Sequence, residues 1–463
     1  MATIGIDNFG GIAPRIHPTL LGANMATRAH NCLLKNGKLV PLHKPAVFSG
    51  VPVSLENGLA GLDEASTIYL WQHGDTATLL AWPGHVSVAS SNLARDSLYR
   101  IFVSGETGIG GSGPDGDHPC IYIWNSEYDI HTNRSAYIVR HDIVKTPLAA
   151  PVAVRASDEA PDETKTLYYT YFVQTWVDKY GYESGPSEPS EEVEMNEGDE
   201  ITFGAISSPP ADARKRRIYA AIAGTAEEYD GFRIVLEQQV SASGSFMETT
   251  KAVSLEDAGE MLPDLQSAKG TLEMVVKVPG NFYAGVERDN LREVRFSEVA
   301  NFSIWHDSCV CTVPDDIVAL AVAMNTVFAL TRGAPYAITG TSPDGMVPSI
   351  IATPAGCVSP RSVTNYNGAV FYAGADGYYM LQDSSSTASN VTEKMFAPRD
   401  WEALHPSDCF ATVIGSAIYL WFPTAGKQVV MNMKDDSSVA ISTHEIEAKC
   451  VCGNVLIGRR GAV

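Results

Sequence analysis

The chain has 463 residues, of which 45% are hydrophobic and 19% charged, a composition typical of folded proteins rather than disordered ones. No run of roughly 18 apolar residues and no secretory-signal pattern occurs, so we expect no membrane span and no export. The net charge of −21 argues against a protein that grips nucleic acid through its overall field.

The first predicted element is a β-hairpin. Asn36-Gly37 stands between the short apolar runs Leu33-Leu34 and Leu39-Val40, and Pro41 ends the second arm. Asn-Gly favours a type I′ turn because both central residues need a positive φ. The local sequence does not identify the strand with which this hairpin pairs.

Further strands are predicted to start at Ile68, Tyr99 and Cys120, where β-branched and aromatic runs are bounded by Gly, Pro, Asn and Asp. Residues 108–113 read GIGGSG and match the dinucleotide-binding pattern G-x-G-x-x-G. A helix has to follow that pattern, whereas here the chain continues PDGDHP, so we interpret the segment as a loop tip. The nearby Asp115, Asp117 and His118 lack the spacing of a calcium-binding EF-hand loop.

Residues 148–272 differ from their surroundings. Long alternating strands are predicted at Tyr168–Val177 and Arg217–Ile222, with the turn sequence GYESGPS following the first. This pattern predicts a β-sandwich similar to fibronectin type III domains, with these two strands in its core. Because surface loops tolerate whole inserted domains, we expect the sandwich to be an insertion.

Charge is concentrated in this insertion. Residues 151–200 hold thirteen acidic residues against three basic ones, which we first interpret as a solvated acidic face. The candidate acidic interface residues are Glu191, Glu192 and Glu194. The basic candidates are Arg214, Lys215, Arg216 and Arg217. This basic cluster could contact phosphates, but it leads into an apolar strand, so we expect salt bridges within the chain or to a neighbouring subunit.

Strand pairs recur in the C-terminal half. Their first strands start at Phe282, Val327, Val370 and Ile418, which are 43 to 48 residues apart. A period of about 40–50 residues with a hairpin in each unit is typical of β-propeller blades. We therefore predict an all-β protein with a propeller of about six blades. Short helices are expected only near 22–34 and 393–404, where Pro398 interrupts the second.

The expected domains are residues 1–147 and 273–463, which together form the propeller, and the inserted acidic sandwich, 148–272. A propeller has to be closed between its first and last blades. The last predicted strands contain Cys450 and Cys452 and have no evident partner in the sequence. We expect the hairpin around Asn36 and Gly37 to complete the blade that contains these cysteines.

No catalytic constellation is evident, and we expect neither enzyme activity nor a cofactor. The chain has no G-x-S-x-G elbow and no H-E-x-x-H helix, and SPDGM at 342–346 lacks the spacing and tryptophan of a sialidase turn. The C-x-C pairs 309–311 and 450–452 would each point to one face of a strand, where metal ligation stays open but small buried side chains are expected. The tryptophans expected in the core are Trp71, Trp82, Trp124 and Trp421.

Four segments resemble tail nozzle, or tail hub, proteins of short-tailed bacteriophages. They are Asp7–Pro45, Asn281–Trp305, Ala329–Leu381 and Asp400–Pro406, and they lie within the N-terminal stretch and the C-terminal blades, which together make up roughly half of the chain. Within them, RAHNCLLKNGKLVP nearly reproduces the A-x-N-C-x-L-x-x-G-x-L-x-P start of that family. Its Y-x-I-T-G strand, C-V-S-x-R-S turn and Y-A-S-x-D-G hairpin match Tyr336–Gly340, Cys357–Ser362 and Tyr372–Gly377, with Gly374 where serine is usual. The acidic insertion is the part least similar to the family.

The resemblance implies a structural virion protein found in the phage tail, and in the host cytoplasm during assembly. Such proteins form hexamers below the portal and the adaptor (the head-to-tail connector), conduct genomic double-stranded DNA without specific binding, and attach tail fibres or spikes. Acidic residues, including Glu191, Glu192 and Glu194, would suit the lumen of such a channel because a basic wall would bind phosphates. Two alternatives stay open: a carbohydrate-binding or polysaccharide-degrading tail propeller, and a connector of a long-tailed phage.

Overall fold

The computed structural model describes most of the chain. The described residues are 9–35, 38–41, 65–73, 75–82, 84–91, 96, 99–105, 122–124, 139–140, 147–178, 181–210, 213–223, 231–256, 259–263, 272–302, 304–353, 355–382, 386–433, 440–444, 448, 450–452 and 455–457. The Asn36-Gly37 turn, the glycine-rich segment 108–113 and the group Asp115, Asp117 and His118 lie outside them.

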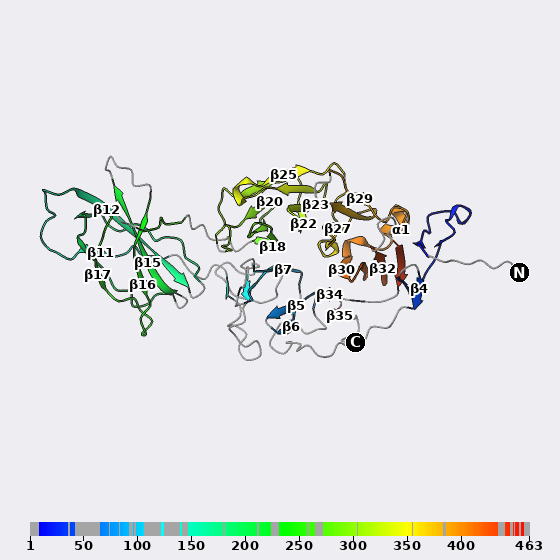
Figure 1. Ribbon diagram of the computed structural model, residues 1–463, viewed down its shortest axis with the longest axis horizontal. Helices are drawn as coiled ribbons and strands as arrows, with labels where there is room; N and C mark the ends of the chain where they lie inside the picture. Colours follow the sequence, from blue (N-terminus) through cyan, green and yellow to red (C-terminus); the bar gives the residue numbers. More distant parts are fainter. Residues whose placement is uncertain are drawn as a thin grey trace. The chain divides into compact units, whose positions relative to one another are not determined.

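The chain divides into two compact units (Figure 1). The large unit comprises residues 1–139, 270–300 and 308–463. The middle unit comprises residues 140–269 and 301–307. The segment 301–307 follows a strand of the large unit in sequence, and no pattern in the sequence had indicated that it belongs with the middle unit.

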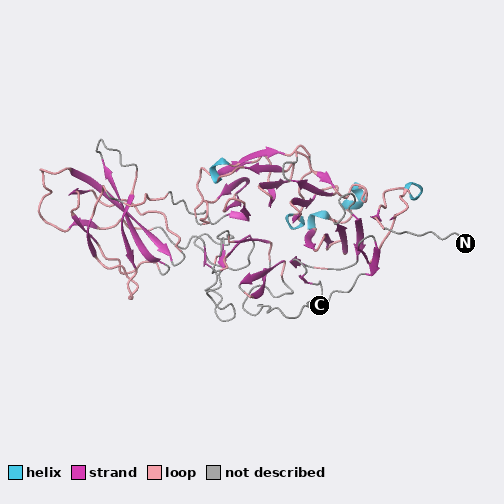
Figure 2. Cartoon of the chain, in the orientation of Figure 1, coloured by secondary structure: helices cyan, strands magenta, loops and turns pink. Residues whose placement is uncertain are grey.

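Strands make up nearly all the regular structure that is described (Figure 2). In the described part of the chain, no helix has the length and apolar character needed to cross a membrane.

The large unit contains four successive four-stranded antiparallel sheets in which neighbouring strands are consecutive in the chain. The first two comprise β18 (Leu272–Val278), β19 (Phe282–Glu287), β20 (Asn290–Phe296) and β21 (Val310–Thr312), then β22 (Ile317–Ala323), β23 (Thr326–Thr331), β24 (Tyr336–Thr339) and β25 (Val347–Ile350). The next two comprise β26 (Thr364–Tyr366), β27 (Ala369–Ala373), β28 (Tyr378–Gln382) and β29 (Ser389–Asn390), then β30 (Phe410–Ile414), β31 (Ala417–Phe422), β32 (Lys427–Asn432) and β33 (Ala440–His444).

The four strand pairs expected in the C-terminal half are confirmed as the middle strands of these sheets. Each pair is antiparallel, with β19 next to β20, β23 next to β24, β27 next to β28 and β31 next to β32. Strands β19, β23 and β27 are buried at every position. A strand that is covered on both faces has a continuous apolar sequence, which is why these runs lack alternation.

The remaining strands of the large unit come from the two ends of the chain. A fifth four-stranded sheet has the order β10-β9-β8-β7, and the other strands form pairs. Its strands are β7 (Val86–Ser90), β8 (Ile101–Gly105), β9 (Tyr122–Trp124) and β10 (Val139–Arg140). The pairs are β1 (Gly11–Ile12) with β2 (Met25–Ala26), β3 (Cys32–Lys35) with β4 (Lys38–Pro41), β5 (Thr67–His73) with β6 (Thr76–Trp82), and β34 (Cys450–Cys452) with β35 (Val455–Ile457).

The first strands of successive sheets contact one another in series. Strand β7 contacts β18, β18 contacts β22, β22 contacts β26, β26 contacts β30, and β30 contacts β34. Strand β34 also contacts β5, which lies near the other end of the chain. The series therefore brings strands from both chain ends together.

The two expected helices need correction. Residues 22–34 contain β2 and the start of β3, and the nearest helical residues form the single 3-10 turn η1 (Pro18–Leu20). In the second region, α1 (Pro398–Glu402) begins at Pro398 rather than being interrupted by it. Proline is favoured at the first helical position because its missing N–H would have no intrahelical partner there. The other 3-10 turns are η3 (Pro343–Gly345), η4 (Pro360–Ser362) and η5 (Pro406–Asp408).

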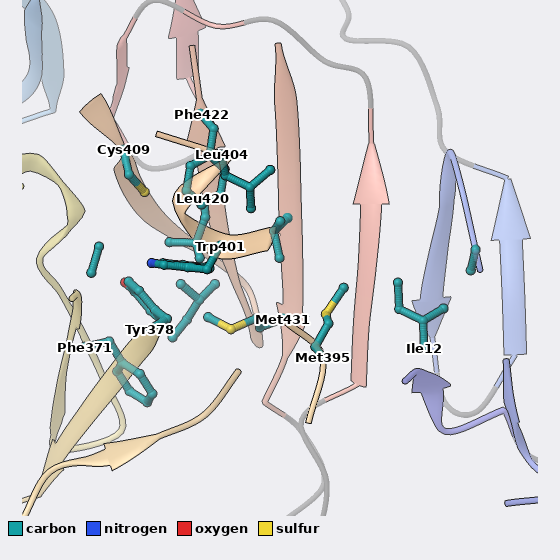
Figure 3. Close-up of a cluster of buried hydrophobic side chains, with 14 of the residues drawn as sticks. Ile12, Phe371, Tyr378, Met395, Trp401, Leu404, Cys409, Leu420, Phe422 and Met431 are labelled. Atoms are coloured by element: carbon teal, nitrogen blue, oxygen red, sulfur yellow. The ribbon is translucent and has the colours of Figure 1, made fainter. Parts of the chain in front are cut away.

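Helix α1 places Trp401 in a buried apolar cluster of the large unit (Figure 3). The Trp401 ring is fully buried and lies 5.4 Å from the ring centroid of Phe422 and 5.6 Å from that of Phe396. Its Nε1 donates a hydrogen bond of 2.9 Å to the Gly374 carbonyl. Other cluster members come from the third and fourth sheets and from the N-terminal segment, including Phe371, Tyr378, Leu420, Met431 and Ile12. The Trp401 side chain therefore connects α1 with the third and fourth sheets.

The middle unit contains two sheets. One has three strands in the order β11-β14-β17, and the other has four in the order β13-β12-β15-β16. The strands are β11 (Ala153–Arg155), β12 (Leu167–Asp178), β13 (Val193–Asn196), β14 (Glu200–Phe203), β15 (Ala213–Ala223), β16 (Arg233–Gln239) and β17 (Thr249–Ala252). Both sheets contribute to one buried cluster, in which Phe172 of β12 and Phe203 of β14 meet edge to face at 5.3 Å.

A proline- and serine-rich segment runs along β12 in the middle unit. Serine recurs there at every third position, as Ser184, Ser187 and Ser190. Each serine N–H donates to a β12 carbonyl, and the N–H of that same β12 residue donates to the serine hydroxyl. The β12 residues are Trp176, Gln174 and Phe172 respectively. A three-residue repeat is the period of a polyproline II helix, so this segment satisfies the edge of β12 without being a regular strand.

We expect Ser187→Ala to destabilise this edge by about 1–3 kcal/mol, because the buried Gln174 N–H loses the acceptor that lies 3.1 Å away. Hydrogen exchange of the peptide covering 172–176 should accelerate by one to two orders of magnitude, in proportion to that loss. Ser207→Ala is the matched control because Ser207 is exposed. Equal exchange in both variants would contradict the role of the hydroxyl.

Candidate functional site

The acidic candidates lie at the edge of the four-stranded sheet of the middle unit. Glu191, Glu192 and Glu194 are exposed, while Val193 and Met195 between and after them are buried. Glu192 accepts a 2.7 Å hydrogen bond from the Tyr171 hydroxyl, and this bond raises the pKa of Tyr171. Among the described residues, the carboxylates of Glu191 and Glu194 have no hydrogen-bond or ion-pair partner. The alternation thus presents a row of acidic side chains to solvent.

The basic candidates divide between the two faces of β15. Lys215 and Arg217 lie on one face and form ion pairs with Glu237 of β16, at 2.8 Å and 2.9 Å respectively. Hydrogen bonds from Lys215 and Arg217 lower the pKa of Glu237. Arg214 is exposed. The salt bridges within the chain that we expected of this cluster are therefore present at Lys215 and Arg217.

Arg216 lies on the other face of β15 and is only 1% exposed. Its Nε donates to Gln174 Oε1 at 2.8 Å, and its Nη1 donates to the Gly204 carbonyl at 2.9 Å. Burial lowers the pKa of Arg216 to about 10. The sequence prediction grouped Arg216 with its neighbours as an interface residue, whereas the period-two alternation of β15 turns it into the interior.

The sequence did not single out Glu183, although it is the acceptor at the centre of a polar cluster. Its side chain accepts from Arg217 Nη1 at 2.6 Å, from the Tyr219 hydroxyl at 2.6 Å and from the Thr175 hydroxyl at 2.5 Å. Burial, followed by the hydrogen bond to Glu183, raises the pKa of Tyr219 well above its ordinary value. Glu183 forms an isolated β-bridge with Val177 outside the regular strands, so only the three-dimensional fold brings it to β15.

The C-terminal cysteines lie beside β5. The Cys450 thiol donates to the Ala65 carbonyl at 3.6 Å, and the Leu70 N–H donates to Cys452 Sγ at 3.4 Å. Both cysteines belong to an apolar cluster with Ile68. The two cysteines therefore do point to one face of their strand, and that face packs against β5.

The expected partner of the N-terminal hairpin needs correction. Strands β3 and β4 pair in the register Cys32↔Pro41 to Lys35↔Lys38, which leaves two residues for the turn, as predicted. However, β3 lies beside β33, the last strand of the fourth sheet, and the N-terminal strand next to β34 is β5. Local sequence encodes the hairpin but not a contact made about 400 residues away along the chain.

The sequence motif Cys357–Ser362 forms a buried joint between three sheets. The Cys357 N–H donates to Thr331 O of β23 at 2.8 Å, and the Ala373 N–H of β27 donates to the Ser362 hydroxyl at 2.9 Å. The Ser359 hydroxyl donates to the Cys409 carbonyl, immediately before β30, at 2.6 Å. These motif residues are therefore used for joining sheets.

The tyrosine of the adjoining hairpin completes this joint. Tyr378 is fully buried, and its hydroxyl donates to the Ser362 carbonyl at 2.9 Å. The matching strand Tyr336–Gly340 contains β24, and the hairpin Tyr372–Gly377 contains the turn between β27 and β28. The motifs Tyr336–Gly340 and Tyr372–Gly377 thus lie in two consecutive sheets, and the motif Cys357–Ser362 lies between them in the sequence.

Most of the remaining cysteines and tryptophans predicted to be in the core are buried. Cys309 and Cys311 are buried in an apolar cluster, as are Trp71, Trp82 and Trp421 in their sheets. The side chain of Trp124 lies outside what the structure describes. Within the described ranges, no group of three or more His, Cys, Asp or Glu side chains is placed to hold a metal ion.

Comparisons with known proteins identify no family. No protein-family model matches the chain, and no curated protein matches it. Among solved structures, Hsv2 of Kluyvelomyces marxianus is 8% identical, with a TM-score of 0.25 over 51% of this chain and 58% of that one, so the match spans less than two thirds of Hsv2. AztD of Citrobacter koseri is 8% identical, with a TM-score of 0.25 over 60% of this chain and 97% of that one. PorZ of Porphyromonas gingivalis is 12% identical, with a TM-score of 0.25 over 54% and 34%. These values support no inference about function.

Proposed function

We propose that this chain is a structural tail nozzle, or hub, protein of a short-tailed bacteriophage. The observation that carries the proposal is the use made of the motif residues that resemble that family. Cys357, Ser359 and Ser362 of the turn motif are buried and hydrogen-bonded between sheets, and Tyr378, directly after the hairpin motif, donates to Ser362, so the motifs serve to build a scaffold. Motifs whose residues connect sheets indicate a family that shares a structural role rather than a catalytic reaction.

The proposal includes a six-bladed propeller. Five blades would be the four-stranded sheets that begin with β7, β18, β22, β26 and β30, and the sixth would combine β34 and β35 with β5 and β6. The series of contacts between first strands supports a closed arrangement, because it returns from β34 to the N-terminal strand β5. Closure by strands from both ends removes exposed sheet edges. The middle unit would be the inserted fibronectin type III-like sandwich.

Nozzle function requires an oligomer that encloses DNA without holding it. We propose a hexamer that continues the channel of the portal and the adaptor, with genomic DNA passing through and tail fibres or spikes attached outside. The carboxylates of Glu191 and Glu194 are exposed and have no partner in the described part of the chain, which supports a surface that repels phosphates. A closed, symmetric ring is the usual form of such homo-oligomers.

Native mass spectrometry tests the assembly. The purified chain, alone and mixed with the adaptor of its own phage, is expected to form a sixfold ring in at least one of the two samples. A monomer in both samples would refute the nozzle proposal. Glycan-array binding or cleavage of a capsular polysaccharide by the chain would favour a tail propeller that acts on carbohydrate instead.

Charge reversal tests the acidic surface. With Glu191, Glu192 and Glu194 changed to lysine, we expect DNA release from purified particles to slow by roughly tenfold or more at low salt, because each lysine adds a phosphate contact. Raising the salt from about 50 to 200 mM should restore much of the rate. The control carries lysine at the exposed Asp158, Glu159 and Glu163 of the same unit. Release at the wild-type rate would place the three glutamates away from the DNA.

A further inference from the structure

The middle unit contains a cavity of about 690 Å³. Its walls come from the segment 147–152, the segment 204–210 and the strands β12 and β15. The walls are mainly apolar, with Trp176, Ile206 and several prolines among the lining residues. A volume of roughly 300–1,000 Å³ with apolar walls and few polar groups is typical of small-molecule sites.

Among the described residues that line this cavity, Arg216 is the only charged one. It lies in the interior without a carboxylate, since its two hydrogen bonds go to the neutral oxygens of Gln174 and Gly204. A guanidinium has five N–H donors, so three of them have no acceptor among the described residues. Burying a cation without a counter-ion is costly, and the usual solution is an anionic partner.

Two further features indicate what kind of anion fits. Trp176 also lines the cavity, and its indole N–H has no acceptor within the described part of the chain. At the rim, Leu148 is 100% and Val152 65% exposed, so apolar surface continues outwards from the cavity. One buried positive charge matches a single negative charge, whereas a dianionic phosphate would require more cations than the walls provide. The fork of a guanidinium also fits both oxygens of a carboxylate.

The floor of the cavity is preorganised for such a ligand. Gln174 accepts from Arg216 and donates from Nε2 to the Ala149 carbonyl at 2.8 Å, which ties the guanidinium to the wall formed by 147–152. The opposite wall is fixed by the Gly204 N–H, which donates to the Val152 carbonyl at 2.9 Å. Because the guanidinium is already held in place, little side-chain entropy is lost on binding.

We propose that the middle unit binds an organic monocarboxylate with an apolar body, whose carboxylate pairs with Arg216 while the apolar part lies against Trp176 and the rim at Leu148. The proposal is independent of the nozzle function. The acidic field of the unit disfavours anions at long range, but that field is screened by salt beyond about 10 Å, whereas a buried pair is screened much less.

Isothermal titration calorimetry of the full chain with octanoate, octan-1-ol and octylammonium tests this. We expect octanoate to bind at least about tenfold more tightly than octan-1-ol, the difference that charge-assisted hydrogen bonds contribute. Octylammonium should bind least. Equal affinities for octanoate and octan-1-ol, or no binding by either, would overturn the proposal.

Substitutions of single residues test whether the ligand binds in this cavity. Arg216→Met should abolish the preference for octanoate while leaving octan-1-ol binding, which also reports that the cavity is intact. Arg217→Met removes the same charge from the next residue, on the other face of β15, and should keep the preference. If Arg216→Met does not fold, Leu148→Asp decides: its side chain is fully exposed, and the added carboxylate should weaken octanoate binding several-fold. A preference that survives Arg216→Met, or octanoate binding unaffected by Leu148→Asp, contradicts the assignment.

Discussion

Replacing Trp401 with alanine is expected to lower the free energy of unfolding of the large unit by about 3–5 kcal/mol. The indole is fully buried in a cluster with side chains of the third and fourth sheets, so its removal leaves a cavity that several elements would have to move together to fill. The Gly374 carbonyl would also lose its 2.9 Å hydrogen bond. An unsatisfied buried acceptor adds to the loss of apolar contact.

Urea unfolding of the full chain, followed by near-ultraviolet circular dichroism, measures this loss. Because two units can unfold separately, hydrogen exchange of the peptides covering β27 and β31 assigns the change to the large unit. Glu402→Ala, in the same helix but with an exposed side chain, is the matched control and should stay within about 0.5 kcal/mol of the parent. A Trp401→Ala variant as stable as this control would show that Trp401 does not stabilise the packing between α1 and the two sheets.

The core around Trp401 also shows how far sequence reasoning reaches. The strands on either side of it were predictable, because β27 and β31 are apolar runs that end at a glycine-containing turn. The helix between them is only partly predictable: the sequence pattern indicates a helix, but Pro398, which is expected to interrupt it, is the first residue of α1. That Trp401 faces two sheets depends on contacts between elements, which no local pattern specifies.

The charged candidates show the same division. Successive side chains of a strand point to opposite faces of the sheet, so Arg216 has to lie on the other face of β15 from Lys215 and Arg217. This rule alone predicts one buried guanidinium in the basic cluster. The acceptors of that guanidinium, Gln174 and Gly204, come from other segments and were not predictable. The same holds for Glu183, which lies outside the regular strands, and for the position of β5 next to β34. Pairing over long sequence separations depends on the whole fold.

The large unit is expected to lose stability steeply in alkali. Burial raises the pKa of Cys357 to about 12, against 9.0 for an ordinary thiol, and of Cys311 to about 12. Burial also raises the pKa of Tyr378 well above the ordinary 10.0. Because these groups keep their protons longer in the folded chain than in the unfolded chain, the unfolded chain binds fewer protons once the pH exceeds about 9. Stability is therefore fully present below about pH 9 and falls as the pH rises towards 12.

Each such group contributes up to about 1.4 kcal/mol of lost stability per pH unit within its window. Urea unfolding at about pH 8, 10 and 11 should therefore show a fall of several kcal/mol in the free energy of unfolding. Tyr378→Phe should make that fall shallower above about pH 10, at the cost of leaving the Ser362 carbonyl without its donor. Tyr169→Phe is the control, because Tyr169 lies in β12 of the middle unit and its replacement should not alter the unfolding of the large unit. If the two variants have the same slope, ionisation of Tyr378 does not limit alkaline stability, and the joint that it completes with Ser362 opens before the tyrosine loses its proton.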